Sequence, residues 1–317
     1  MRDADKVDGV SSTSTRARTK PLGRMGGIFA GLATVLNCAG CASLEHGLMA
    51  PGGPIASDER FLFFLSIALI LICVLPVLVL TPWLAWRYRR NTRNAEYRPK
   101  WEFSRPVEFV IWGVPIAVTA VLVVILWVMA YRLDPYRALP SDKPALEVEA
   151  ISLDWKWLFI YPEQHVAAVN ELAIPVGRPV HLRLTSDSVM QSLMIPSLAG
   201  QIYTMAGMQT QLYIQADHAG NYRGENTQYN GEGFQKQKFQ TLAMSDADFA
   251  HWVAQARSSG NTLDCASFRE LQKREVLSAP RLYQTANPGL FHWVIDKYRI
   301  HPQPACRGYR REKSHDG

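Results

Sequence analysis

Two long apolar runs, residues 61–86 and 109–130, constrain the fold of this chain most strongly. Neither run contains a charged side chain. At a helical rise of about 1.5 Å per residue, each run is long enough to cross the ~30 Å hydrocarbon core of a bilayer. The alternative, two buried helices of a soluble protein, is disfavoured because a soluble core rarely holds two uninterrupted runs of this length. The pair predicts a transmembrane helical hairpin over residues 58–133.

The loop between the runs, residues 87–105, sets the expected orientation of the hairpin. It is strongly basic, with Glu96 and Glu102 as its acidic residues. Lys and Arg beside a span remain in the cytoplasm, so everything after Tyr131 is expected in the periplasm of a bacterial inner membrane. Because these charges serve topology, the net charge of +6 does not indicate nucleic-acid binding.

Residues 1–41 are typical of a secretory signal. Basic residues precede an apolar run, residues 26–36, that is too short to span a bilayer. A small residue before Cys41, in Ala39-Gly40-Cys41, resembles the cleavage box of bacterial lipoproteins. Cys41 is therefore the favoured lipidation candidate over Cys38, and an uncleaved signal anchor is the alternative. Residues 42–57 are expected to form a periplasmic linker.

From Leu146 onward, apolar and polar residues alternate and turn residues recur at short intervals. This pattern predicts an all-β, antiparallel sandwich or barrel over residues 145–243. One strand should place four aromatic side chains on one face, which is more often a core or a subunit interface than a cofactor site. These are Trp155, Trp157, Phe159 and Tyr161.

After Ala243 the pattern becomes helical. Ser245 and Asp248 predict a capping box, and further helices are expected over residues 264–275 and 288–298. Residues 244–300 should thus form a small helical appendix, and residues 301–317 a disordered tail. Cys265 and Cys306 would lie outside the cytoplasm, where a disulfide can persist, but the sequence leaves open whether they meet.

Glu108 lies at the cytoplasmic end of the second predicted helix. It could simply balance the helix dipole beside Arg105. It could also collect protons for a partner subunit, since ionisable groups within spans often mark proton routes.

Several motifs resemble a known family. Residues 107–115 read Val-Glu-Phe-Val-Ile-Trp-Gly-Val-Pro, and residues 154–164 hold the aromatic strand. Together with residues 186–192 and 201–210, they resemble subunit II of the haem–copper respiratory oxidases in its quinol-oxidising form. The similarity extends over residues 36–300. It implies a cupredoxin fold for the outer domain and a place for Glu108 at the mouth of a proton channel.

The resemblance also directs attention to a metal site. Relatives that oxidise cytochrome c hold a dinuclear copper centre built from two thiolates, two imidazoles, a thioether and a backbone carbonyl, and soft donors of this kind suit copper. The corresponding positions here are Gln191, Asn226, Gln228, Asn230, Phe234 and Gln237. No Cys occurs between Cys73 and Cys265, so no other alignment restores the thiolates. The three histidines of the outer domain lack partners at ligand spacing and are interpreted as surface residues: His165, His181 and His218.

These observations predict a subunit without a cofactor or metal of its own and without independent catalysis. The resemblance implies assembly with oxidase subunit I, which would carry haems and copper, and with smaller membrane subunits. The complex would oxidise ubiquinol, reduce O2 to water and translocate protons; neither cytochrome c nor nucleic acid is an expected partner. The alternatives are a copper-binding cytochrome c oxidase subunit II or membrane-tethered copper carrier, and a free-standing cupredoxin-like lipoprotein.

Overall fold

The computed structural model of the chain describes residues 47–89, 102–299 and 306. The predicted signal, both lipidation candidates and most of the basic loop lie outside these residues. The predicted disordered tail also lies outside them, apart from Cys306.

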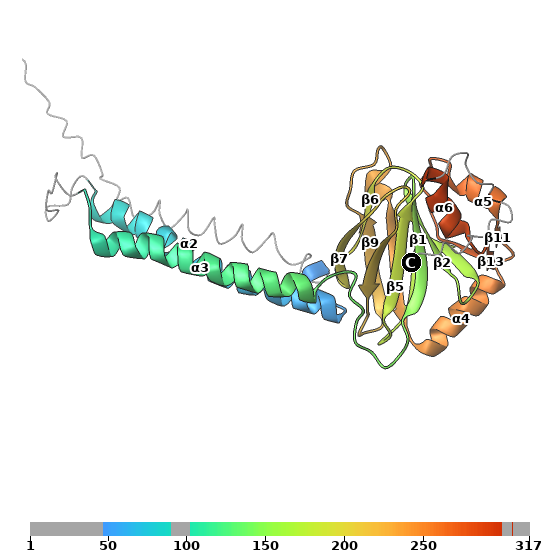
Figure 1. Cartoon of the computed structure of the whole chain (residues 1–317), viewed down its shortest axis with the longest axis horizontal. Helices are drawn as coiled ribbons and strands as arrows, with labels where there is room; N and C mark the ends of the chain where they lie inside the picture. Colours follow the sequence, from blue (N-terminus) through green and yellow to red (C-terminus); the bar gives the residue numbers. More distant parts are fainter. Residues whose placement is uncertain (1–46, 90–101, 300–305, 307–317) are drawn as a thin grey trace, which may run out of the picture. The chain divides into compact units, whose positions relative to one another are not determined.

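Two long helices form the hairpin (Figure 1). Helix α2 spans Pro54–Arg87 and helix α3 spans Arg105–Arg132, and both are long and apolar enough to cross a membrane. Asp58 of α2 pairs with Arg132 of α3, with 3.4 Å between carboxylate oxygen and Nε. Ser104 occupies the N-cap position of α3, although its side chain forms no capping hydrogen bond.

The predicted linker before the hairpin is shorter than expected and is bonded to the sandwich. A short 3-10 helix, η1, spans Gly47–Met49, and α2 begins at Pro54, a residue whose fixed φ suits a first helical turn. The Gly52 N–H donates to the carbonyl of Ser197 at 2.6 Å. At Gly53, a Cβ would lie 2.0 Å from the carbonyl oxygen of Gln215, so only glycine fits there.

The outer domain is a sandwich of two sheets with strand orders β12-β3-β2-β1-β5-β8 and β4-β10-β9-β6-β7. The strands of the larger sheet are β1 (Leu146–Leu153), β2 (Lys156–Tyr161), β3 (Val166–Val169), β5 (Val180–Ser186), β8 (Thr210–Ile214) and β12 (Arg281–Tyr283). Those of the smaller sheet are β4 (Glu171–Pro175), β6 (Gln191–Ile195), β7 (Ala199–Thr204), β9 (Gly220–Asn226) and β10 (Lys238–Met244).

The prediction of an antiparallel sandwich or barrel was wrong in one respect. Strand β1 pairs with β5 in parallel, with Val148 opposite Leu182, and β10 pairs with β4 in parallel. The other pairs in the two sheets are antiparallel. Alternation of side chains reveals that a strand has one buried face, but it carries no information about the direction of its neighbour.

The core between the sheets contains most of the predicted aromatic face. Trp157, Phe159 and Tyr161 are fully buried there, and the first two rings stack with centroids 6.4 Å apart. Trp155 does not belong to this face, which corrects the prediction. It occupies the turn between β1 and β2 with a φ of 67°, so its side chain leaves the strand, and its indole N–H donates to the carbonyl of Asn230 at 3.3 Å.

Three helices follow the sandwich: α4 (Asp246–Arg257), α5 (Cys265–Leu271) and α6 (Leu290–Arg299). Ser245 caps α4 as predicted, because its hydroxyl oxygen accepts the N–H of Asp248 at 3.1 Å. Helix α5 ends well before residue 275, the predicted end. The carbonyl of its last residue, Leu271, accepts a hydrogen bond from the Lys156 ammonium group.

The region after residue 243 is not purely helical, contrary to expectation. Strand β12 pairs antiparallel with β3 and so extends the larger sheet, while β11 (Thr262–Leu263) and β13 (Thr285–Ala286) form a small parallel pair. Helix α6 packs over the outer face of β1 and β5 (Figure 1). A second apolar core lies here, and Leu158, Phe268 and Phe291 are among its buried members.

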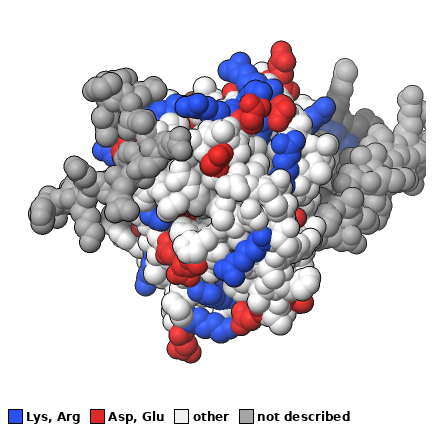
Figure 2. Space-filling model, turned by 90° about the vertical axis from the view of Figure 1, so that its right-hand side faces the viewer, with Lys and Arg blue, Asp and Glu red and all other residues white. Residues whose placement is uncertain are grey.

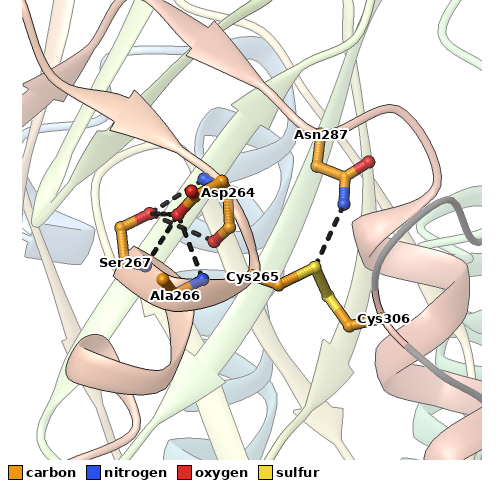
Figure 3. Close-up of a disulfide and its surroundings, with 6 residues drawn as sticks. All are labelled: Asp264, Cys265, Ala266, Ser267, Asn287 and Cys306. Atoms are coloured by element: carbon orange, nitrogen blue, oxygen red, sulfur yellow. Dashed lines mark hydrogen bonds between the residues drawn. A yellow bond between two sulfur atoms is a disulfide. The ribbon is translucent and has the colours of Figure 1, made fainter.

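A disulfide closes this region. Cys265, the first residue of α5, is bonded to Cys306, and Cys306 is buried in the second core (Figure 3). Asp264 caps the helix by accepting the N–H groups of Ala266 and Ser267. The structure thus shows that Cys265 and Cys306 pair, which the sequence left open.

Candidate functional site

Four of the six positions that the resemblance assigns to copper ligands lie at one end of the sandwich. Gln191 begins β6, Asn226 ends β9, Asn230 lies in the following loop, and Gln237 directly precedes β10. Their side chains come together, and they are called the amide cluster below. A glutamine or asparagine offers both donors and an acceptor, so such a group can satisfy itself internally.

Gln237 is the centre of the amide cluster. Its Nε2 donates to Oε1 of Gln191 at 2.5 Å, and its Oε1 accepts from Nδ2 of Asn226 at 3.0 Å and of Asn230 at 2.7 Å. Nε2 groups of both glutamines also donate to the carbonyl of Leu153, each at 3.2 Å. Gln191 and Gln237 are completely buried. The cluster therefore joins both sheets through hydrogen bonds.

Two of the predicted positions stay outside the side-chain contacts of the cluster. Gln228 takes part only through its backbone, which exchanges hydrogen bonds with the amide of Asn226 at 2.8 and 3.0 Å. The ring of Phe234, in the 3-10 helix η2 (Phe234–Lys236), packs against Tyr229. Phe234 and Gln237 also line a shallow cavity of about 420 Å³.

The residues at this site do not fit a thiolate-bridged copper centre. The sequence supplies no Cys in the sandwich, and the amide groups are already hydrogen-bonded to one another. Oδ1 of Asn230 is buried without a hydrogen-bond partner, but a lone amide oxygen is a poor ligand for copper. Among the described residues, no group of three or more His, Cys, Asp or Glu side chains could hold a metal ion.

Of the three histidines, His165 and His218 are exposed, as predicted. His181 is not a simple surface residue, because only 12% of its side chain is exposed. Its Nδ1 lies 2.8 Å from a carboxylate oxygen of Glu147, its Nε2 lies 3.1 Å from Oε1 of Gln211, and its ring stacks on Tyr213. These contacts engage both ring nitrogens in a polar cluster on the outer face of the larger sheet.

Burial of Glu149 in the same cluster raises the pKa of its carboxyl to about 6; the nearby Arg183 guanidinium opposes this shift, and Glu147 adds to it. Oε1 of Glu149 nevertheless accepts a hydrogen bond from Arg183 at 2.5 Å. The free-energy cost of removing the carboxylate from water therefore exceeds the stabilisation that its ion pair with Arg183 provides.

Sequence reasoning overlooked Lys156, which links the amide cluster to the appendix. Its backbone carbonyl accepts from Nε2 of Gln237 at 3.5 Å, and its fully buried side chain extends in the other direction. Nζ donates to the carbonyls of Leu271 at 2.9 Å and Lys273 at 2.7 Å, past the end of α5. Burial lowers the pKa of this ammonium group, and Glu275 partly opposes that shift. The available sequence signal for this buried side chain was a lysine that lies among the aromatic residues of a predicted strand.

Asp187 is a second link that sequence reasoning overlooked. Its carboxylate, 1% exposed, accepts from Lys297 Nζ at 2.8 Å and Gln272 Nε2 at 2.5 Å. Its backbone carbonyl accepts from the Tyr298 hydroxyl at 3.0 Å. Asp154 adds an ion pair to Arg274. These contacts hold the appendix against the strand ends that carry the amide cluster.

The face of the molecule that carries the C-terminal helices has no single sign of charge. Acidic and basic side chains are interspersed around a largely uncharged centre (Figure 2). Extended fields of one sign are what attract highly charged partners, and this face does not present one.

Comparison with known proteins decides the family. A family model described as the COX Aromatic Rich Motif matches residues 257–301. The chain is 42% identical over 270 residues to cytochrome bo(3) ubiquinol oxidase subunit 2 of Pseudomonas aeruginosa, covering 85% of this chain and 81% of that protein. It is 43% identical over 271 residues to ubiquinol oxidase subunit 2 of Acetobacter aceti, covering 84% and 87%. The chain belongs to the ubiquinol oxidase subunit 2 family.

Among solved structures, the periplasmic domain of subunit II of the Bradyrhizobium japonicum cytochrome oxidase aligns with 37% of this chain and 96% of that domain, at 19% identity and a TM-score of 0.35. The aromatic-rich motif that matches this chain corresponds to the appendix from the end of α4 through α6. Its buried aromatic residues Phe268, Tyr283, Phe291 and Trp293 belong to the second core.

In this member of the ubiquinol oxidase subunit 2 family, Glu108 lies in the first turn of α3. Its side chain is partly buried, and one carboxylate oxygen, Oε2, accepts the indole N–H of Trp112 at 3.0 Å. Glu108 is the only charged side chain between Arg105 and Arg132. It is far along the chain from the amide cluster and belongs to the membrane hairpin.

Proposed function

We propose that this chain is the second subunit of a bacterial respiratory complex that oxidises ubiquinol, reduces O2 to water and translocates protons. Its hairpin anchors it in the inner membrane beside the large subunit, and its sandwich lies in the periplasm. Membership of the ubiquinol oxidase subunit 2 family and the two membrane-length helices support this proposal.

The amide cluster is the observation that indicates which electron donor the complex uses. A cytochrome c donor would need an external metal relay, and the cluster consists of amides that bond to one another in place of thiolates and imidazoles. Electrons therefore enter the complex from a membrane-dissolved quinol, directly at haem in subunit I. Haems and copper reside in that partner subunit, and cytochrome c is not a substrate.

Within this assembly the chain has two structural tasks and one in proton transfer. The hairpin packs against subunit I and other membrane subunits, and the sandwich covers the periplasmic face. Glu108, near the cytoplasmic end of α3, collects protons for the oxygen-reducing site. Cys41 is the proposed acylated residue of the mature chain.

The decisive experiment compares two electron donors for the purified complex. We expect rapid oxidation of a soluble ubiquinol analogue and negligible oxidation of reduced cytochrome c. Metal analysis of subunit 2 after its separation from the haem-containing subunit should show no stoichiometric copper. Copper bound to the separated subunit, together with cytochrome c oxidation, would contradict the proposal.

The role of Glu108 has its own test. Glu108→Ala should slow turnover severalfold while the complex still assembles with its normal haem content. Glu102→Ala is a matched control, because Glu102 is an exposed acid close by, outside the helix. Unchanged turnover in Glu108→Ala would return this carboxylate to the simple role of balancing the helix dipole.

A further inference from the structure

Within the part of the chain that the structure describes, Glu108 and Trp112 form the one hydrogen-bonded side-chain pair of α3. The two residues are four positions apart, so they lie on the same helix face, one above the other. The indole N–H donates to Oε2 of Glu108 at 3.0 Å. Trp112 has a single donor and no acceptor, so it can serve the carboxylate but cannot take a proton from it.

The surroundings make this contact important for the carboxylate. Its own helix supplies no other charged side chain between Arg105 and Arg132. In the described residues, no side chain other than Trp112 bonds to the carboxylate. Without that bond, a Glu side chain with several rotatable bonds would sample many positions along the helix surface.

We propose that Trp112 is a positioning residue for proton uptake: its indole N–H holds the Glu108 carboxylate in one rotamer, at the place where protons are collected. This inference rests on the proposed function of Glu108. Proton transfer requires that donor and acceptor lie within hydrogen-bond distance. A carboxylate that samples several rotamers therefore delivers protons more slowly. The indole acts through geometry alone and exchanges no proton.

The test uses the assembled complex and two substitutions that separate the hydrogen bond from the ring. Trp112→Phe keeps an aromatic ring and removes the N–H. Trp112→Gln removes the ring and keeps an N–H donor that can reach a glutamate four positions earlier. If the hydrogen bond positions Glu108, Trp112→Phe loses roughly threefold in turnover, the order expected for loss of one exposed hydrogen bond, and Trp112→Gln stays closer to the parent.

Trp127→Phe is the matched control, because Trp127 is also exposed on α3, and its ring contacts Tyr131 rather than Glu108. It should leave turnover unchanged. Haem content of every variant reports assembly, so a general loss of folding is recognised separately.

Two further measurements respond to proton supply and not to packing. In Trp112→Phe, turnover should decline more steeply with rising pH than in the parent, and the solvent deuterium isotope effect should increase, because proton uptake becomes rate-limiting. The double variant Glu108→Ala/Trp112→Phe should be no slower than Glu108→Ala, since the indole then has nothing to hold.

The outcomes distinguish the inference from the proposal beneath it. If Glu108→Ala slows turnover and Trp112→Phe matches Trp127→Phe, the positioning role is wrong while the function of Glu108 stands. If Trp112→Gln is slower than Trp112→Phe, the ring packs against a partner, and the inference also fails. If Glu108→Ala leaves turnover unchanged, both proposals fail together.

Discussion

Nε2 of Gln237 lies 2.5 Å from Oε1 of Gln191, and this pair joins the loop before β10 to the first residue of β6. Both side chains are fully buried, so neither can exchange its partner for water. The pair occupies two of the six positions that the resemblance assigns to copper ligands. In this chain a hydrogen bond between two amides connects these parts of the sandwich.

Gln237→Ala should lower the free energy of unfolding by about 3 kcal/mol, because it leaves buried amide groups of Gln191, Asn226 and Asn230 without their shared partner. Urea unfolding of the purified full chain in detergent measures this. Gln235→Ala is the control, since Gln235 is exposed in the same loop. Equal stability of the two variants would show that the network contributes nothing.

The Glu149 carboxyl predicts a pH dependence of stability. Its pKa is raised from 4.5 to about 6 in the folded chain, so the native state keeps a proton that the unfolded state releases between these values. This contribution is complete below pH 4.5 and is lost as the pH rises through about 6. It amounts to about 2 kcal/mol.

Glu149→Gln removes that titration. The stability difference between the parent and Glu149→Gln should therefore shift against the parent as the pH rises from 4.5 to 7, in urea unfolding at each pH. Glu163→Gln, at an exposed turn, should keep the slope of the parent. A parallel pH profile for Glu149→Gln and the parent would refute the assignment.

Gly233→Ala should destabilise the end of the sandwich that carries the amide cluster. A Cβ at residue 233 would lie 2.2 Å from the ring of Trp155 and would displace it from its hydrogen bond to Asn230. We expect a loss of about 2 kcal/mol, typical of overpacking, in thermal unfolding followed by tryptophan fluorescence. Gly220→Ala is the comparison, because its Cβ would lie 3.7 Å from its nearest neighbour, an ordinary contact.

The disulfide predicts how firmly the appendix is held. Replacement of Cys265 and Cys306 by Ser should cost about 2–4 kcal/mol, since the bond restricts the unfolded chain. The appendix should then be cleaved faster by a protease, whereas Cys73→Ser, which removes a free thiol of α2, should leave cleavage unchanged. Equal cleavage of all three chains would show that noncovalent contacts alone hold the appendix.

Local patterns predicted a large part of this architecture. The hairpin follows from two apolar runs, and most of the sandwich follows from alternation that reports one buried face per strand. The cap at Ser245 follows from local hydrogen bonding, which needs only residues close in sequence. Each of these signals lies within one continuous segment of the chain and is independent of distant partners.

The missed features depend on distant partners or on a single dihedral angle. Strand β12 is three residues long, which is too short for a periodic sequence signal. It forms because the edge of β3 provides backbone hydrogen-bond partners. Trp155 leaves the aromatic face through one positive φ. Lys156 is buried against the usual tendency of lysine, because backbone carbonyls past α5 surround its ammonium group. The hydrogen bond between Gln191 and Gln237 was not predictable, because it joins residues that are far apart in the sequence.

The pairing of β12 with β3 has a consequence for anyone who would isolate the outer domain. A fragment that ended at Met244 would leave the N–H and C=O groups of β3 open along its outer side and would strip the apolar cover from the larger sheet. Bare edges of this kind recruit strands from other molecules. Such a fragment should self-associate. The segment after Met244 therefore protects the larger sheet against aggregation in addition to packing against it.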